Sequence, residues 1–310
     1  MTWRKLLPVF VLAAIFVAVS ATVLAQDDQF LMPEQSAAKA KQVLNEAIAA
    51  LGGSAYLNLR DTTCDGDIST FDHSGQLNDF VAVHDIHELP SKVRTEYLRK
   101  GRNTILQYVV GIEGLEFAHG GMVITVFNGD HGWSYDRSGV TELPASSVNE
   151  FHEQVKRNID NILRFRLKEP GMEFRYAGED IVDRKKVDWV ELTDADNHTV
   201  RMAIDRVSHL PIRKSIEMRD LKTQLKTEEI EHLSNYHPFN GIETALQVER
   251  ERNGFKVFEA FYEKCTYNTN PPDAQFTKAS LDERWAQSGK KEAEKEAKAK
   301  KKDKDSSSDQ

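Results

Sequence analysis

The chain has 310 residues, of which 40% are hydrophobic and 29% charged, and its net charge is −8 at pH 7. Two excess positive charges lie near the N-terminus and two more follow residue 289, so the body between them is near −12. A body this acidic repels a phosphate backbone, which argues against a nucleic-acid partner.

Residues 1–25 have the pattern of a secretory signal peptide. Arg4 and Lys5 precede an apolar run that ends in small residues at Ala25. We expect cleavage after Ala25 and, because no cysteine follows the cut, no lipid attached there. The mature protein is then expected in the periplasm. If the run is not cleaved, it is long enough to anchor the chain in a bilayer.

Two later segments have helical periodicity. Residues 33–51 carry an apolar stripe at spacings of three and four, with Pro33 in the first turn and Gly52-Gly53 as the stop. Residues 145–171 repeat the pattern and end at Pro170-Gly171. The sequence therefore predicts two helices, the second of which interrupts a long series of strands.

The remaining runs from Thr62 to Phe276 are short, β-branched or aromatic, and separated by polar turns, which is typical of antiparallel meanders. The expected strands are 80–86, 92–98, 104–112, 122–127 and 132–136, then 172–182, 186–192, 200–205, 211–218, 225–233, 243–251 and 256–268. We expect one mainly β domain over residues 26–285. Residues 286–310, rich in Lys and Glu, are expected to form a charged, disordered tail.

The two cysteines, Cys64 and Cys265, lie at opposite ends of the body. In an exported chain they are either a disulfide that ties the first strand region to the last or two buried thiols, and the sequence leaves both open. Their wide separation excludes a CxxC redox or zinc site.

Several expected strands are apolar on both faces. Val126 and Phe127 are neighbours in one strand and point to opposite faces, and so do Phe258 and Phe261 in another. Two helices do not cover both faces of about twelve strands. The strands therefore form either a sandwich with a dry core or a curled half-barrel with helices at its mouth and an apolar cavity inside.

The stretch VITVFNGDHGWSYD contains the strongest candidate chemistry. Asp130 and His131 could be a general base with its orienting carboxylate, or a pair of metal ligands. We interpret the segment as a hairpin, because Asn128-Gly129 favours a tight turn and adjacent strand residues point to opposite faces.

Other catalytic and metal-binding patterns are weaker still. His84 and His87 are three residues apart and fall on opposite faces of a strand. Neither GxSxG nor HExxH occurs, and the glycine pair GGSAY follows a helix instead of opening one. The sequence thus predicts no enzyme, no metal site and no cofactor, since a hydrolase would need clustered titratable groups in a cleft.

Taken in order, these segments resemble the LolA-like outer-membrane lipoprotein-sorting proteins. The motifs are ALGG (50–53), KVRTEY (92–97), the VFNGDHGWSYD hairpin (126–136), IDRVSHLPIRKSI (204–216) and the closing segment 236–268 with its FNGI turn. The likeness covers about residues 36–280. It implies an unclosed antiparallel β half-barrel of about 11–12 strands, with helices covering the concave face and an apolar cavity for the acyl chains of a lipoprotein or another lipid.

We therefore expect a periplasmic lipid- or lipoprotein-binding carrier for outer-membrane lipoprotein sorting, with transfer partners at the inner and outer membranes. The alternative is a sensor or envelope-structural module on the same fold, which binds a protein partner and transports nothing. The polar cavity residue that holds the lid in carriers of this family has no match in this sequence, so no functional residue is carried over beyond the hairpin. The residues expected to line the cavity are Phe80, Val109, Ile124, Val126, Phe127, Trp133, Trp189, Phe258 and Phe261.

Overall fold

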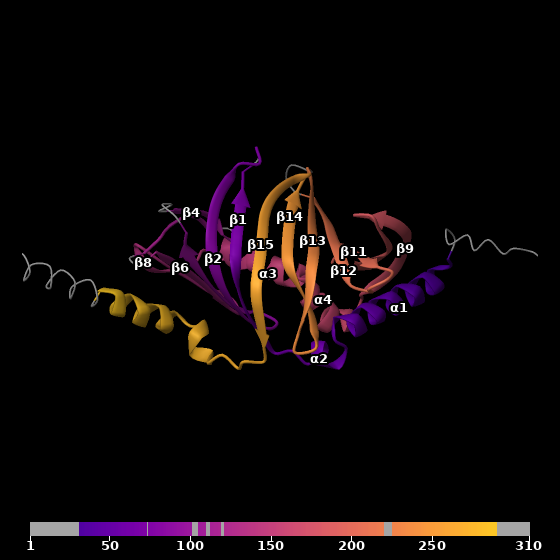
Figure 1. The fold of residues 1–310 in the computed structure, drawn as a ribbon, viewed down its shortest axis with the longest axis horizontal. Helices are drawn as coiled ribbons and strands as arrows, with labels where there is room; N and C mark the ends of the chain where they lie inside the picture. Colours follow the sequence, from indigo (N-terminus) through magenta and orange to yellow (C-terminus); the bar gives the residue numbers. More distant parts are fainter. Residues whose placement is uncertain are drawn as a thin grey trace, which may run out of the picture.

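The computed structural model describes residues 31–289 except 73, 101–104, 110–111, 119–120 and 220–224 (Figure 1). Its helical elements are α1 (Pro33–Leu51), α2 (Ser54–Leu57), α3 (Ala145–Arg157), α4 (Ile159–Arg164), the 3-10 turns η2 (Arg166–Lys168) and η3 (Asp273–Phe276), and a helix over residues 278–289. Its strands are β1 (Asp61–Phe71), β2 (Leu77–Glu88), β3 (Lys92–Arg99), β4 (Ile105–Val109), β5 (Ile112–Glu116), β6 (Met122–Asn128), β7 (His131–Asp136), β8 (Gly139–Glu142), β9 (Glu173–Val182), β10 (Lys185–Thr193), β11 (Thr199–Asp205), β12 (Pro211–Arg219), β13 (Lys226–Phe239), β14 (Ile242–Arg252) and β15 (Phe255–Tyr267). The expected signal peptide and residues 290–310 of the expected tail lie outside the described part.

Thirteen strands form one antiparallel sheet in the order β8-β7-β6-β3-β2-β1-β15-β14-β13-β12-β11-β10-β9, and β4 and β5 form a separate hairpin. β8 and β9 stand at opposite edges, so the sheet is curled but not closed. The expected mainly β, unclosed half-barrel is confirmed. In Figure 1, β1, β15, β14 and β13 run side by side through its centre, and α3 and α4 lie on one side of the sheet.

The sheet has more strands than the expected 11–12. The run 104–112, expected as one strand of the sheet, is instead divided between β4 and β5 and lies outside the sheet, so the two additional strands are β1 and β8. β8 was not predicted because it has only four residues. β1 was not predicted because DTTCDGDISTF has few large apolar side chains, and it is stabilised instead by pairing with β2 and β15 on both sides.

The second predicted helix breaks at Asn158. This residue ends α3 with extended backbone, and its side-chain oxygen then accepts a hydrogen bond from the backbone N–H of Asn161, at 3.1 Å, to open α4. Asn is a favoured N-cap because its short side chain reaches a backbone donor that the helix leaves unpaired. The break turns α4 onto the sheet.

The two faces of the sheet follow from the register, because residues paired across antiparallel strands share a face. We call the inner face the one that carries Val190, Met202 and Ile216. These side chains form one buried cluster with Val43 and Leu44 of α1. The opposite face is the outer face.

Helices and a hairpin cover much of the inner face. α1 and α4 pack over β9–β12, and Ile162 of α4 is almost fully buried there. Leu106 and Leu115 of the β4–β5 hairpin cover Val81 and Val83 of β2. The helices therefore lie in the concavity, as a half-barrel with covering helices requires.

A C-terminal segment that the sequence did not predict to be helical covers part of the outer face. Phe276 and Leu281, both fully buried, pack against Ile124 and Val126. Arg94 fastens this C-terminal segment, because its Nη1 donates to the carbonyl oxygen of Gln275 at 3.0 Å. The prediction that only two helices cover the sheet was wrong. The C-terminal segment provides the missing cover.

Cys64 and Cys265 form a disulfide across the pair of strands β1 and β15. Two residues further on, the strands come so close that a Cβ on Gly66 would lie 2.2 Å from the carbonyl oxygen of Phe261. Glycine is required there because any side chain would clash with backbone. The bridge thus joins the first and last strands in the chain, β1 and β15, which are neighbours at the centre of the sheet.

Candidate functional site

The β6–β7 hairpin confirms the interpretation of the NGDHG stretch as a turn. Its two central residues are Gly129, with φ of 58°, and Asp130, whereas Asn128 is the last residue of β6. His131 stacks on Trp133, and Asp130 Oδ1 lies 3.3 Å from Nε2 of His152 in α3. The adjacent Asp and His do not form a dyad.

The structure does not bring the expected cavity residues together. Phe127 and Phe258 lie on the inner face, Phe127 stacked on Phe151 of α3 with ring centroids 4.3 Å apart. The register places the others on the outer face: Ile124, Val126 and Trp133 under or beside the C-terminal segment, Trp189 in a small cluster of its own, and Phe80 and Phe261 exposed. Val109 belongs to β4, but its side chain lies outside the described part.

α1 and α4 close the concavity over β9–β12. A cleft with a cavity volume of only about 10 Å³ remains beside them, lined by Ile162, Arg166, Met172, Leu192, Asp194, His198 and Val200. Ligand pockets usually have roughly 300 Å³ or more. The apolar hollow that the sequence predicted is therefore filled with helical side chains at this end of the half-barrel.

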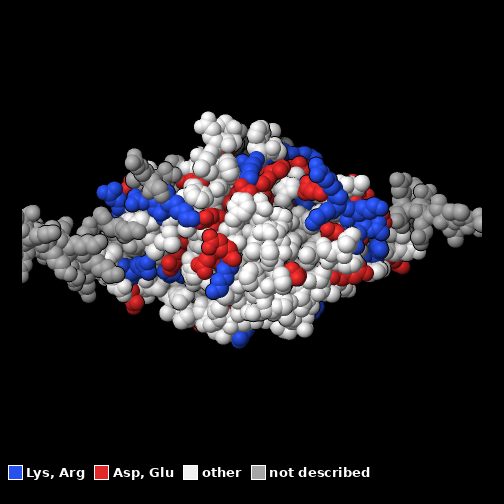
Figure 2. All heavy atoms as spheres, in the orientation of Figure 1, with Lys and Arg blue, Asp and Glu red and all other residues white. Residues whose placement is uncertain are grey.

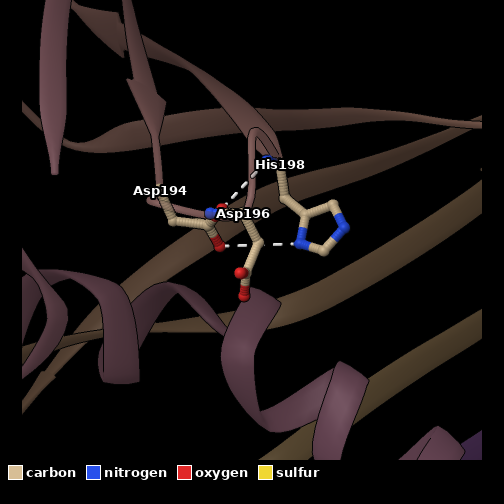
Figure 3. A group of neighbouring side chains, drawn as sticks. All are labelled: Asp194, Asp196 and His198. Carbon is tan, nitrogen blue, oxygen red and sulfur yellow. Dashed lines mark hydrogen bonds and ion pairs between the residues drawn. The ribbon is translucent and has the colours of Figure 1, made fainter. Parts of the chain in front are cut away.

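At the edge of this cleft, Asp194, Asp196 and His198 lie close enough together to suggest a metal site (Figure 3). The carboxylate of Asp194 accepts hydrogen bonds from the backbone N–H groups of Asp196 and His198, at 3.0 and 2.9 Å, and pairs with Arg166 Nη2 at 3.1 Å. Burial would raise the pKa of Asp194, but these partners lower it. These contacts close the turn of the β10–β11 hairpin, and they explain why the three side chains lie together without a metal ion.

A second such group, His232, Glu249 and Glu251, lies across β13 and β14. His232 Nε2 is 3.1 Å from Glu251 Oε1, and Lys256 Nζ is 2.7 Å from Glu249 Oε2. Both carboxylates thus have protein partners, and these contacts explain the group without a ligand.

A different part of the inner face is better suited to a ligand. Leu233 of β13, Val248 of β14, and Phe258 and Tyr262 of β15 are only half-buried, although they adjoin buried side chains on either side. We call these four residues the inner strip. They are apolar or aromatic, lie in the concavity, and are less well covered than the faces under α1 or the β4–β5 hairpin.

Three charged side chains border the inner strip. The register aligns Lys214, Glu231 and Arg250 across β12, β13 and β14, with Phe258 next on β15. Lys214 Nζ donates to Glu231 Oε1 at 2.9 Å, and Arg250 Nε donates to Glu231 Oε2 at 2.8 Å. We call these residues the inner triad.

The inner triad keeps Glu231 ionised inside the fold. Burial alone would raise the pKa of Glu231, but Lys214 and Arg250 lower it to about 2. The Arg250 guanidinium also lies 5.0 Å from the centre of the Phe258 ring, which is the distance of a cation–π contact. The triad is therefore joined to the strip through Phe258.

The other end of the strip is polar but uncharged at Tyr262. Its hydroxyl donates to Asp85 Oδ2 at 3.1 Å, and burial followed by the Asp85 charge raises the pKa of Tyr262 well above its usual range. Tyr262 therefore stays protonated and presents its ring to the strip. The inner strip thus runs from the ion-paired Arg250 at one end to the Tyr262 hydroxyl and its acceptor Asp85 at the other.

Polar contacts fasten α4 beside the strip. The Tyr56 hydroxyl of α2 donates to Asp160 Oδ1 at 2.7 Å, and Asn161 Nδ2 donates to the carbonyl oxygen of Pro90 at 3.3 Å. Arg164 donates to the carbonyl oxygen of Leu59. These bonds fix where the helical cover of the inner face ends.

The inner triad was missed by sequence reasoning. PIRKSIEM and KTEEIEHL alternate as strands with one polar face, and the sequence does not reveal that Lys214 and Glu231 point inward. The three charged residues are far apart in the sequence, and only the strand order and register show that they are neighbours.

No family model matches the chain, and no curated protein matches it. Among solved structures, it aligns with a DUF1329 family protein from Desulfovibrio piger at 13% identity and a TM-score of 0.51, over 78% of this chain and 98% of that one. A putative outer membrane lipoprotein-sorting protein domain from Vibrio parahaemolyticus (10%, TM-score 0.48, 79% and 99%) and a LolA superfamily protein from Nitrosomonas europaea (12%, 0.49, 78% and 99%) also align. The chain has a LolA-like fold. At these identities the likeness is one of fold alone.

Proposed function

We propose that this protein is a periplasmic carrier that binds an acyl chain of a lipid or lipoprotein on the inner strip. The observation that carries the proposal is the half-buried state of Leu233, Val248, Phe258 and Tyr262 inside an unclosed half-barrel. An apolar surface left partly open in a concavity is the usual setting of a binding site. Each methylene that it shelters from water stabilises the complex by about 0.8 kcal/mol.

The mode of binding follows from the covering elements. Over β9–β12 the concavity is filled by α1 and α4, so an acyl chain would lie along β13–β15, between α4 and the β4–β5 hairpin. A longer chain would reach the apolar side chains under α4 only if that helix moved. Such movement would break the bonds from Tyr56 to Asp160 and from Asn161 to Pro90.

The periplasmic location and the transfer partners are further parts of the proposal. The location is supported by the signal-peptide pattern of residues 1–25 and by the disulfide, because disulfides persist in oxidising compartments. In the described part of the chain, no helix is both long and apolar enough to span a membrane. A carrier of this kind would receive its lipid at the inner membrane and deliver it at the outer membrane.

Lipid analysis of the purified protein tests the proposal. The full chain is exported to the periplasm of a Gram-negative host, purified without detergent and measured by native mass spectrometry, and the extracted lipid is then identified. We expect a bound species that carries acyl chains, and uptake of a fluorescent fatty acid by the emptied protein. Protein that carries no lipid, takes up no fatty acid and co-purifies with a protein partner would instead support a sensor or structural module.

A further inference from the structure

The inner triad carries an unbalanced charge. Lys214 and Arg250 are both cations, and they share the single carboxylate of Glu231, so one positive charge remains. The neighbouring pair on the same face, Arg252 with Glu229, is balanced. The triad itself therefore has a net charge of +1, although the body of the chain is acidic, its surface mixes acidic and basic side chains (Figure 2), and the carboxylates of Asp79 and Asp85 lie further along the same inner face.

This surplus charge is accessible at Arg250. The side chains of Lys214 and Glu231 are 10% and 11% exposed, whereas that of Arg250 is 46% exposed. Arg250 bonds to Glu231 through Nε, and among the described residues its two Nη groups donate no hydrogen bond. A guanidinium held at Nε presents its Nη groups in a fixed direction, which suits the oxygens of a phosphodiester.

We propose that Arg250 binds the phosphate of a phospholipid whose acyl chain lies on the inner strip. This inference rests on the proposed function and adds the class of headgroup. Glu231 and Lys214 act as positioning residues, because they hold the Arg250 guanidinium next to Phe258 and leave the triad one positive charge. The headgroup lies at the charged end of the strip, and the acyl chain extends past Phe258 and Val248 toward Tyr262.

The contact with Arg250 favours a headgroup with a negatively charged phosphodiester over an uncharged headgroup that has no phosphate. The acyl chains can be the same in both, so the preference reports on the headgroup contact alone. A hydrogen bond to a charged group contributes about 1.5–3 kcal/mol, which corresponds to a preference of roughly tenfold or more.

Two lipids with equal chains provide the test. Dioctanoyl phosphatidylglycerol and dioctanoylglycerol, which has the same acyl chains but no phosphate, compete separately with the neutral apolar probe N-phenyl-1-naphthylamine on the full-length mature protein. We expect phosphatidylglycerol to displace the probe about tenfold more effectively. In Arg250→Gln the ratio should fall toward one, and in Arg250→Lys, which keeps the charge, part of the preference should remain.

Arg252→Gln is the matched control. Arg252 lies two residues away on the same strand and face, its side chain is also 46% exposed, and its loss changes the net charge equally. We expect it to keep the headgroup preference of the native protein. An equal loss in Arg252→Gln, or equal displacement by both lipids in the native protein, would overturn the headgroup site while leaving the acyl site intact. Failure of the native protein to bind the probe or either lipid would overturn the proposed function itself.

Discussion

Phe258 and Phe261 lie three residues apart on β15 and point to opposite faces of the sheet. Phe258 is half-buried on the inner face beside Arg250, whereas Phe261 is 45% exposed on the outer face opposite Asp67. The two aromatic rings are thus a natural pair for separating a binding role from a structural one. The strand and the residue type are the same.

A carboxylate at position 258 should abolish lipid binding. Phe258→Asp removes the apolar ring from the inner strip and puts a carboxylate within reach of Arg250, where an acyl chain would have to desolvate the charges at a cost of several kcal/mol. We expect the uptake of a fluorescent fatty acid to fall by at least about tenfold. Titration of the folded variant with the fatty acid measures the change.

Phe261→Asp is the control for that substitution. Its side chain is on the outer face, so lipid uptake should stay within about twofold of the native value. Circular dichroism shows whether both variants are folded. Equal loss of uptake in the two folded variants would mean that the inner face has no special role.

Removing the carboxylate of the inner triad should destabilise the fold. Glu231→Gln leaves Lys214 buried without a counter-charge, which costs about 3–5 kcal/mol of unfolding free energy. Glu229→Gln, with a side chain 30% exposed and a single partner in Arg252, should cost less than about 1 kcal/mol. Urea denaturation at pH 7 compares the two variants.

The stabilisation by Glu231 should also depend on pH. The pKa of Glu231 is lowered from 4.5 to about 2 on folding. A lowered carboxyl pKa gives stability that is complete above the unfolded value and is lost as the pH falls toward the folded value. The difference in stability between the native protein and Glu231→Gln should therefore shrink between pH 5 and pH 2; a difference that is constant over this range would contradict the ion pair.

The disulfide should contribute substantially to stability, because it closes a loop of 201 residues. Replacing both cysteines by serine should lower the unfolding free energy by about 2–5 kcal/mol, as expected for a bridge that restricts the unfolded chain. Urea midpoints with and without reductant measure this effect. The native protein in reductant should match the double variant, and an unchanged midpoint in both would show that the bridge contributes nothing.

The C-terminal segment should behave as part of the core. Leu281→Ala removes a fully buried side chain from the cluster with Ile124 and Val126 and should cost about 2–4 kcal/mol. Trp285→Ala, four residues later on the same helix, removes a side chain that is 39% exposed and packs edge-on against Tyr135, and it should cost less than Leu281→Ala, about 1–2 kcal/mol. Thermal unfolding of the two variants distinguishes a packed segment from a loosely attached one.

Periodicity predicted the elements that bury a large apolar stripe. α1 was expected over residues 33–51 and found there, because its stripe and its glycine stop are local signals. The helix over residues 278–289 was missed because Leu281 and Trp285 are its only large apolar residues. Its burial depends on the outer face of β6, which lies more than a hundred residues away in the chain.

Side chains along a strand alternate between its two faces, so the sequence shows which residues share a face but not which face is the inner one. Val126 and Phe127 are adjacent and equally apolar, yet Val126 lies under the C-terminal segment and Phe127 under α3. A choice of cavity residues by hydrophobicity therefore mixes the two faces. The inner triad could not be predicted for the same reason, since its three residues become neighbours only through the register of β12, β13 and β14.

Photocrosslinking tests most directly whether acyl chains bind to the inner strip. A fatty acid with a diazirine in its chain is bound to the mature protein, irradiated, and the labelled peptides are identified by mass spectrometry. We expect the label on inner-face residues of β13–β15, above all Val248, Phe258 and Tyr262. Label confined to the outer face, for example at Phe80 and Phe261, or no label above that of an unrelated protein, would contradict the site.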